Sequence, residues 1–142
     1  MDSRSPEAVV QDLEQACRAL ADSGLGWEWD SRFSAALAVV KDPQHHEVLD
    51  LVQAQLAAAW DYKSIRQAPG PVAELARAWG GLRPGQQMFT CDSPGALMLF
   101  AVWWPWGGDT TFSLRIGCVA EGAGAEGLDL PALIKRCFGL EG

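Results

Sequence analysis

The chain has 142 residues, of which 49% are hydrophobic and 20% are charged. A chain of this length corresponds to one domain, 1–142, that buries roughly two-thirds of its unfolded surface, so folding requires neither a disulfide nor a metal. The formal charge of −7 lies in residues 1–62, which contain 11 acids and 4 bases, whereas residues 63–142 contain 7 of each. An acidic surface repels phosphates, so nucleic acids and anionic membranes are excluded as preferred partners.

Helical spacing and capping signals predict four helices in the first part of the chain. Ser5-Pro6 is a typical helix start, and Asp42-Pro43 repeats the same cap-then-proline signal. Between them, Asp30 or Ser31 is the expected cap of a helix that carries Phe33, Leu37 and Val40 on one face. The predicted helices cover residues 5–23, 31–41, 43–65 and 72–79.

A three-stranded antiparallel meander follows, over residues 86–91, 96–104 and 110–119. The middle strand belongs to the longest apolar run, Ala96 to Trp106, and both of its faces are apolar, as in a strand covered on two sides. Asp129 predicts the cap of a last helix over 130–138. The expected fold class is therefore α+β, with the helices stacked on one face of the sheet.

The tryptophans are the best candidates for a binding site. Trp103, Trp104 and Trp106 end the apolar run, next to a turn at Gly107-Gly108-Asp109. Tryptophan is enriched among interface hot spots, but large aromatic side chains are usually mostly buried, so the alternative is that all three cap the core. An extended segment at Trp27 and Trp29 would point both rings the same way. The predicted binding residues are Trp103, Trp104, Trp106, Asp109, Trp27 and Trp29.

No pattern predicts a catalytic residue, a metal or a cofactor. His46 and Asp50 are spaced i, i+4 and would supply half of a metal site, but no second pair completes it. The four cysteines are widely spaced without a Cys-x-x-Cys pair, so we interpret them as small buried hydrophobic residues in a reducing compartment. A cysteine brought close to His45 or His46 is the alternative, which would make an enzyme.

These observations predict a small cytoplasmic protein, because the polar N-terminus lacks the apolar core of a signal peptide. The leading hypothesis is a non-enzymatic protein-binding module, since bacterial immunity proteins, secretion chaperones and assembly adaptors share this size and charge. Acidic residues of the first two helices would steer a basic partner, and the tryptophans would anchor it. The alternatives are a small-molecule sensor or carrier with a pocket between sheet and helices, and a homodimer.

Overall fold

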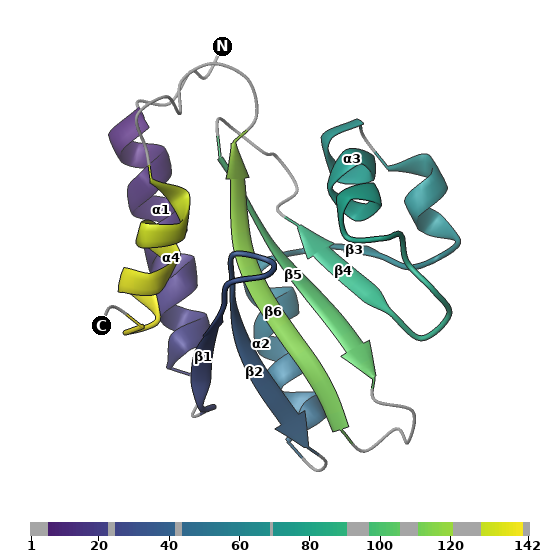
Figure 1. Ribbon diagram of the computed structural model, residues 1–142, viewed down its shortest axis with the longest axis horizontal. Coiled ribbons are helices and arrows are strands. Elements are labelled where there is room, and N and C mark those ends of the chain that lie inside the picture. The colour runs from purple at the N-terminus through teal and green to yellow at the C-terminus, as the bar shows by residue number, and fades with distance from the viewer. Residues whose placement is uncertain are drawn as a thin grey trace.

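The computed structural model in Figure 1 describes residues 6–22, 25–41, 44–68, 70–90, 97–105, 111–120 and 129–140. Its helices are α1 (Pro6–Ala21), α2 (His45–Gln55), α3 (Gly70–Ala78), α4 (Leu130–Cys137) and the 3-10 helix η1 (Ser64–Gln67). Its strands are β1 (Trp27–Asp30), β2 (Ala35–Lys41), β3 (Ala58–Trp60), β4 (Gln87–Thr90), β5 (Leu97–Pro105) and β6 (Thr111–Ala120). None of the helices in these ranges has the length and apolar run that crossing a membrane requires.

The six strands form one antiparallel sheet, in the order β1-β2-β6-β5-β4-β3. The two longest strands, β5 and β6, lie at its centre. The hairpin β1–β2 joins one side, where Ala36 of β2 pairs with Ile116 of β6. On the other side β3 pairs with β4, so that Trp60 lies opposite Met88. Strand pairing therefore brings both halves of the chain into a single sheet.

Helices cover the two faces of this sheet unequally. One face, which we call the helix face, packs against α1, α2 and α4 around Phe89, Leu99 and Leu114. The opposite face, which we call the α3 face, carries a smaller core in which Phe100 and Val102 pack with residues of α3. Figure 1 shows α1 and α4 together at one side of the sheet and α3 beyond β4 at the other. Over β2 the α3 face is less covered, because Val39 is exposed and Leu37 is only half-buried.

The predicted arrangement, four N-terminal helices followed by a three-stranded meander and a last helix, is wrong. The fold is α+β, but the sheet has six strands, and three of these (β1, β2 and β3) come before the predicted meander in the sequence. Helices also lie on both faces of the sheet instead of one.

The segment predicted as a helix over 31–41 contains a tight turn and strand β2. Asp30 does act as a cap, since its Oδ1 accepts a bond from the backbone N–H of Phe33 at 3.4 Å, but it closes a hairpin turn in which Ser34 has a φ of 53°. Alanine exceeds most residues in helix propensity by less than about 1 kcal/mol, and pairing with β1 and β6 on both sides outweighs that preference. Three alternate residues of β2 are buried on the helix face: Ala36, Ala38 and Val40.

The helix predicted over 43–65 ends at Gln55. The backbone is extended again at Ala58–Trp60, where the indole Nε1 of Trp60 donates to Thr90 Oγ1 at 3.0 Å and holds β3 beside β4. Asp61 then turns the chain into η1, because its Oδ1 accepts from the backbone N–H of Ser64 at 2.8 Å. The apolar spacing that predicted one long helix therefore belongs to α2, a short edge strand and a 3-10 turn.

Candidate functional site

The predicted tryptophan site is divided between the two faces of the sheet. Trp103 and Trp104 are neighbours on β5, so their side chains point to opposite faces. Trp103 is only 3% exposed and stacks on Phe112 within the core of the helix face, with ring centroids 4.7 Å apart. Trp104 lies on the α3 face and is half-buried. Trp106 and Asp109 lie outside the described residues.

Trp27 and Trp29 point to the helix face, as the alternation of β1 requires, and do not join Trp104. Trp27 packs against Phe138 beside α4, at 4.5 Å between ring centroids. The ammonium of Lys135 on α4 lies 4.8 Å from the Trp29 ring. Both tryptophans therefore hold the edge of the sheet to α4.

Trp104 belongs to a compact group of residues that we call the arginine–aromatic cluster: Asp30, Phe33, Trp79, Trp104 and Arg115. The guanidinium of Arg115 lies 4.9 Å from the Trp104 ring and 5.2 Å from the Phe33 ring. Phe33 stacks on Trp79 at 4.3 Å, and Trp79 meets Trp104 edge to face at 5.7 Å. The cluster thus joins the β1–β2 turn, the end of α3 and the two central strands, and in Figure 1 this turn crosses in front of β6.

The cationic group of the cluster, the guanidinium of Arg115, forms an ion pair with Asp30. The Nε of Arg115 donates to Asp30 Oδ2 at 2.9 Å, and the two side chains are only 15% and 13% exposed. Burial raises the pKa of Asp30, but the bonds from Arg115 and from the backbone N–H of Phe33, together with the positive charge of Arg115, outweigh it and leave that pKa below its ordinary value. The carboxylate therefore stays charged and fixes the guanidinium between the two rings.

The indole N–H of Trp104 destabilises this cluster. Its Nε1 is buried and finds no hydrogen-bond partner among the residues that the structure describes. An unsatisfied buried donor costs about 1–3 kcal/mol, which the ring contacts and the cation–π contact of Trp104 must offset.

Next to the cluster, the α3 face carries an exposed apolar side chain. Val39 is 38% exposed and pairs with Ser113, which pairs in turn with Trp104 on its other side. Val39 and Trp104 are therefore two strand spacings apart, about 10 Å. Leu37, in the next row along β2, pairs with Arg115 and is half-buried.

The chain matches no protein-family model, no curated protein and no solved structure. The site is therefore described by its own geometry and charge.

Sequence reasoning placed only Trp104 of this cluster among the site residues. The sequence predicts Phe33 on a helix face and Asp30 as a helix cap, and it gives Arg115 no role in a site. The sequence did contain one signal, the alternation of side chains along a strand. Trp104 and Arg115 both point to the face of the sheet opposite the one that Trp103 faces. Their contact depends on the pairing register of β5 and β6, and the contact with Phe33 depends on the β1–β2 turn.

The acidic residues of the first helices lie on the other side of the sheet from the cluster. Glu14 of α1 forms ion pairs with Arg136 of α4 at 2.8 Å and with Arg18 at 3.9 Å. Glu47 and Asp50 are exposed on α2. The second predicted acidic helix, over 31–41, is strand β2, so only α1 remains of the two helices predicted to form the acidic surface. The exposed acids of α2 belong to the third predicted helix.

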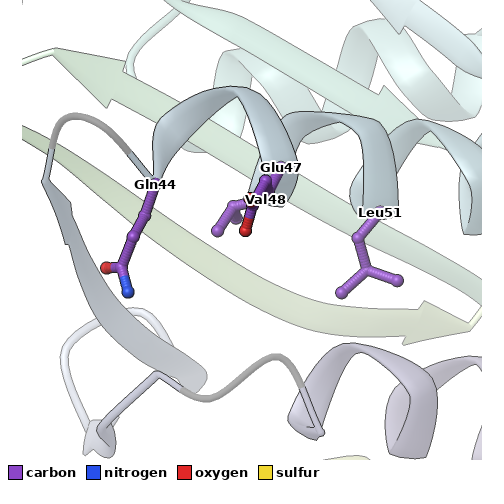
Figure 2. Close-up of a pocket in the computed structure, with 4 residues that line it drawn as sticks. All are labelled: Gln44, Glu47, Val48 and Leu51. Atoms are coloured by element: carbon purple, nitrogen blue, oxygen red, sulfur yellow. The ribbon is translucent and has the colours of Figure 1, made fainter.

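At least two hollows are lined by described residues, and no strand residue lines either of these two. The first, of about 180 Å³, lies beside α2 and is lined by Gln44, Glu47, Val48 and Leu51, with Gln44 and Leu51 extending to the same side of the helix in Figure 2. This is smaller than the roughly 300–1,000 Å³ of typical ligand pockets. The second, of about 520 Å³, lies between η1, α3 and residues 80–82.

The histidines and cysteines belong mainly to the packing of the helix face. His45 lies against Phe112, with ring centroids 5.4 Å apart. Cys17 and Cys137 are buried. The side-chain interaction with Cys137, together with burial, raises the pKa of Cys17, and the same interaction lowers the pKa of Cys137. Within the described ranges, no group of three or more histidine, cysteine or acidic side chains is arranged to hold a metal ion. Cys91 lies outside the described residues.

Proposed function

We propose that this chain is a non-enzymatic protein-binding module that holds its partner on the α3 face, over β2 and the arginine–aromatic cluster. The observation that carries the proposal is the position of Val39, exposed on β2 at two strand spacings from the half-buried ring of Trp104. Of the predicted tryptophans whose side chains are described, only Trp104 supports the proposal, because Trp27, Trp29 and Trp103 pack toward the helices.

The composition of the cluster supports this role. Tryptophan and arginine are the residue types most enriched among interface hot spots. Arg115 is already held by Asp30 and by two rings, so binding would immobilise few additional rotamers there. Ordering a flexible side chain at an interface costs about 0.5–1.5 kcal/mol, and a fixed cluster avoids most of that cost.

The acidic surface would act separately from this contact surface. α1 and α2 lie on the helix face, so Glu47 and Asp50 are too far from Val39 to form one continuous patch with it. Long-range attraction to a basic partner would raise the association rate more than the affinity. Salt should therefore slow association, whereas loss of Val39 or Trp104 should speed dissociation.

The test captures a partner from the lysate of the natural host and compares variants at two exposed apolar side chains. Val39→Glu introduces a charge on the α3 face, and Tyr62→Glu introduces the same charge at Tyr62, which is 37% exposed in the turn before η1. We expect the wild type and Tyr62→Glu to retain the same stoichiometric partner and Val39→Glu to lose it, with all three showing the same circular dichroism. Loss of the partner from both variants, or from neither, would contradict this contact surface.

A small-molecule carrier is the second candidate, and the hollow between η1 and α3 favours it. Its volume of about 520 Å³ lies within the range of ligand pockets.

A further inference from the structure

We infer that the hollow between η1 and α3 binds a monovalent organic anion with an apolar body, such as a carboxylate on an aliphatic chain. This inference rests on the second candidate function, the small-molecule carrier, and is independent of the protein-binding proposal. The residues that line the hollow belong to η1, α3 and residues 80–82 and include none of the cluster or of β2. Three features of the hollow favour such a ligand: its local charge, two unpaired guanidinium groups and the apolar part of its lining.

The hollow lies in a basic segment of an acidic chain. The net charge of the chain is −7, yet residues 63–82, which include the whole lining, contain three bases and one acid, Glu74. A concave surface with an excess of one charge concentrates ligands of the opposite charge. The segment therefore attracts anions, although the chain as a whole repels them.

Two arginines lie in the lining, one from each helix. Arg66 in η1 and Arg77 in the last turn of α3 are both exposed, and the guanidinium group of neither makes a hydrogen bond or ion pair with another residue in the described part of the chain. A guanidinium presents a planar fork of donors that matches the two oxygens of a carboxylate. Both forks are available for a ligand.

The rest of the lining is apolar or lacks side chains. Ile65, Ala76 and Leu82 supply the apolar part, and Gly80 and Gly81 leave backbone uncovered. A Cβ added at either glycine would meet no atom within 4 Å, which confirms that open space lies beside them. A surface of this mixed kind favours a ligand with a charged group and an apolar body over a small hydrated ion.

The end of α3 disfavours a doubly charged anion. The negative end of the helix dipole lies beside Arg77, and it repels every negative charge on a ligand. Charge-assisted bonds from a guanidinium are stronger than this repulsion. A charge paired with a guanidinium is therefore held, whereas a further charge that no guanidinium pairs only adds repulsion.

The inference is tested first with two fluorescent probes of similar shape. 1-Anilinonaphthalene-8-sulfonate carries one negative charge, and N-phenyl-1-naphthylamine is its neutral analogue. We expect Arg66→Gln and Arg77→Gln each to weaken binding of the sulfonate about tenfold and to leave binding of the neutral probe unchanged. Arg83→Gln is the matched control, because it removes the same charge from a residue outside the lining, and it should change the affinity less than about twofold.

Competition and mapping complete the test. Octanoate should displace the sulfonate probe, and inorganic phosphate at the same ionic strength should not. In an amide proton–nitrogen spectrum, octanoate should shift the resonances of Gly80 and Gly81. The inference would be overturned if Arg83→Gln weakened binding of the sulfonate as much as Arg66→Gln and Arg77→Gln, or if neither of those two variants weakened it. It would also be overturned by displacement of the probe by phosphate, by octanoate shifts confined to other residues, or by the absence of octanoate binding at millimolar concentration.

Discussion

The close approach of Phe100 and Gly117 shows how one residue sets the packing of the central strands. The two are partners across β5 and β6, and the ring of Phe100 lies over the glycine. A Cβ at Gly117 would come within 2.7 Å of Phe100 Cζ. The ring has little freedom to withdraw, because Trp79 contacts it edge to face at 5.5 Å. Glycine is therefore required here for space and not for an unusual backbone conformation.

Substitution of this glycine should destabilise the protein. We expect Gly117→Ala to lower the free energy of unfolding by about 1–3 kcal/mol, the usual cost of overpacking, as measured by urea denaturation. Gly26→Ala is the control, since a Cβ there would meet no atom within 4 Å, and its effect should be within about 0.5 kcal/mol. The double mutant Gly117→Ala/Phe100→Leu should lose less stability than the sum of the two single mutants, because the smaller side chain relieves the clash. Losses of the two single mutants that simply add would contradict the proposed clash.

Among the elements, the β1–β2 turn has the most specific anchoring. Its Asp30 caps the turn and reaches Arg115, which is 85 residues away in the sequence, in a pair that is mostly buried. The pair between Glu14 and Arg136 has a similar distance, but the arginine side chain is 54% exposed. Exposed pairs typically contribute about 0–1 kcal/mol, so the turn depends on its ion pair far more than α1 and α4 depend on theirs.

Mutation of Asp30 should therefore lower the free energy of unfolding by an amount that depends on pH. The native pKa of Asp30 is below its ordinary value, so the stabilisation is complete above about pH 4, the unfolded pKa, and is lost as the pH falls through the native pKa. Asp30→Asn should cost about 1–3 kcal/mol at pH 7, and the difference from the wild type should shrink below pH 4. Urea denaturation across pH 2.5–7 measures it, in steps of about 0.5 pH unit around the unfolded pKa. A difference that did not vary with pH would show that the carboxylate charge is unimportant, and Arg136→Gln should change little at any pH.

At the scale of the whole molecule, the protein has two cores of unequal size separated by one sheet. The core of the helix face includes residues from three helices and four strands, whereas the core of the α3 face has one α-helix and adjoins the short edge strand β3. Strands β5 and β6 contribute to both cores. Elements with few buried contacts open more easily than those that share both cores.

The rates of amide hydrogen exchange should therefore differ between the central strands and the edge of the sheet. We expect the bonded amides of β5 and β6 to exchange only on global unfolding, and those of β3 and η1 to exchange through local opening that costs at least about 3 kcal/mol less. Native-state exchange followed by residue-resolved NMR at low urea concentrations measures these free energies. Uniform protection across β3, β5 and β6 would instead indicate a single cooperative unit.

Several parts of the fold were predictable because their signals are local. α1, α3, α4 and the alternating strand β6 lie close to their predicted positions, since apolar spacing reports which side of an element is buried and Asp129 caps α4 by accepting from Ala132 N at 3.1 Å. The turn after Asp30 was misread because a capping aspartate serves helices and hairpins alike. Within the candidate site, the predictable fact was that Trp103 and Trp104 face opposite sides of a strand.

The sequence alone thus determined the α+β class, the positions of most helices and the apolar character of both faces of β5. Only the tertiary structure decided that Ala35–Lys41 is a strand, that Trp104 and not Trp103 adjoins the more open face, and that Arg115 sits between Trp104 and Phe33. The physical reason is that strand pairing is non-local: the edge of β6 that accepts β2 lies more than 70 residues later in the chain, and its hydrogen bonds outweigh a helix preference worth less than about 1 kcal/mol per residue.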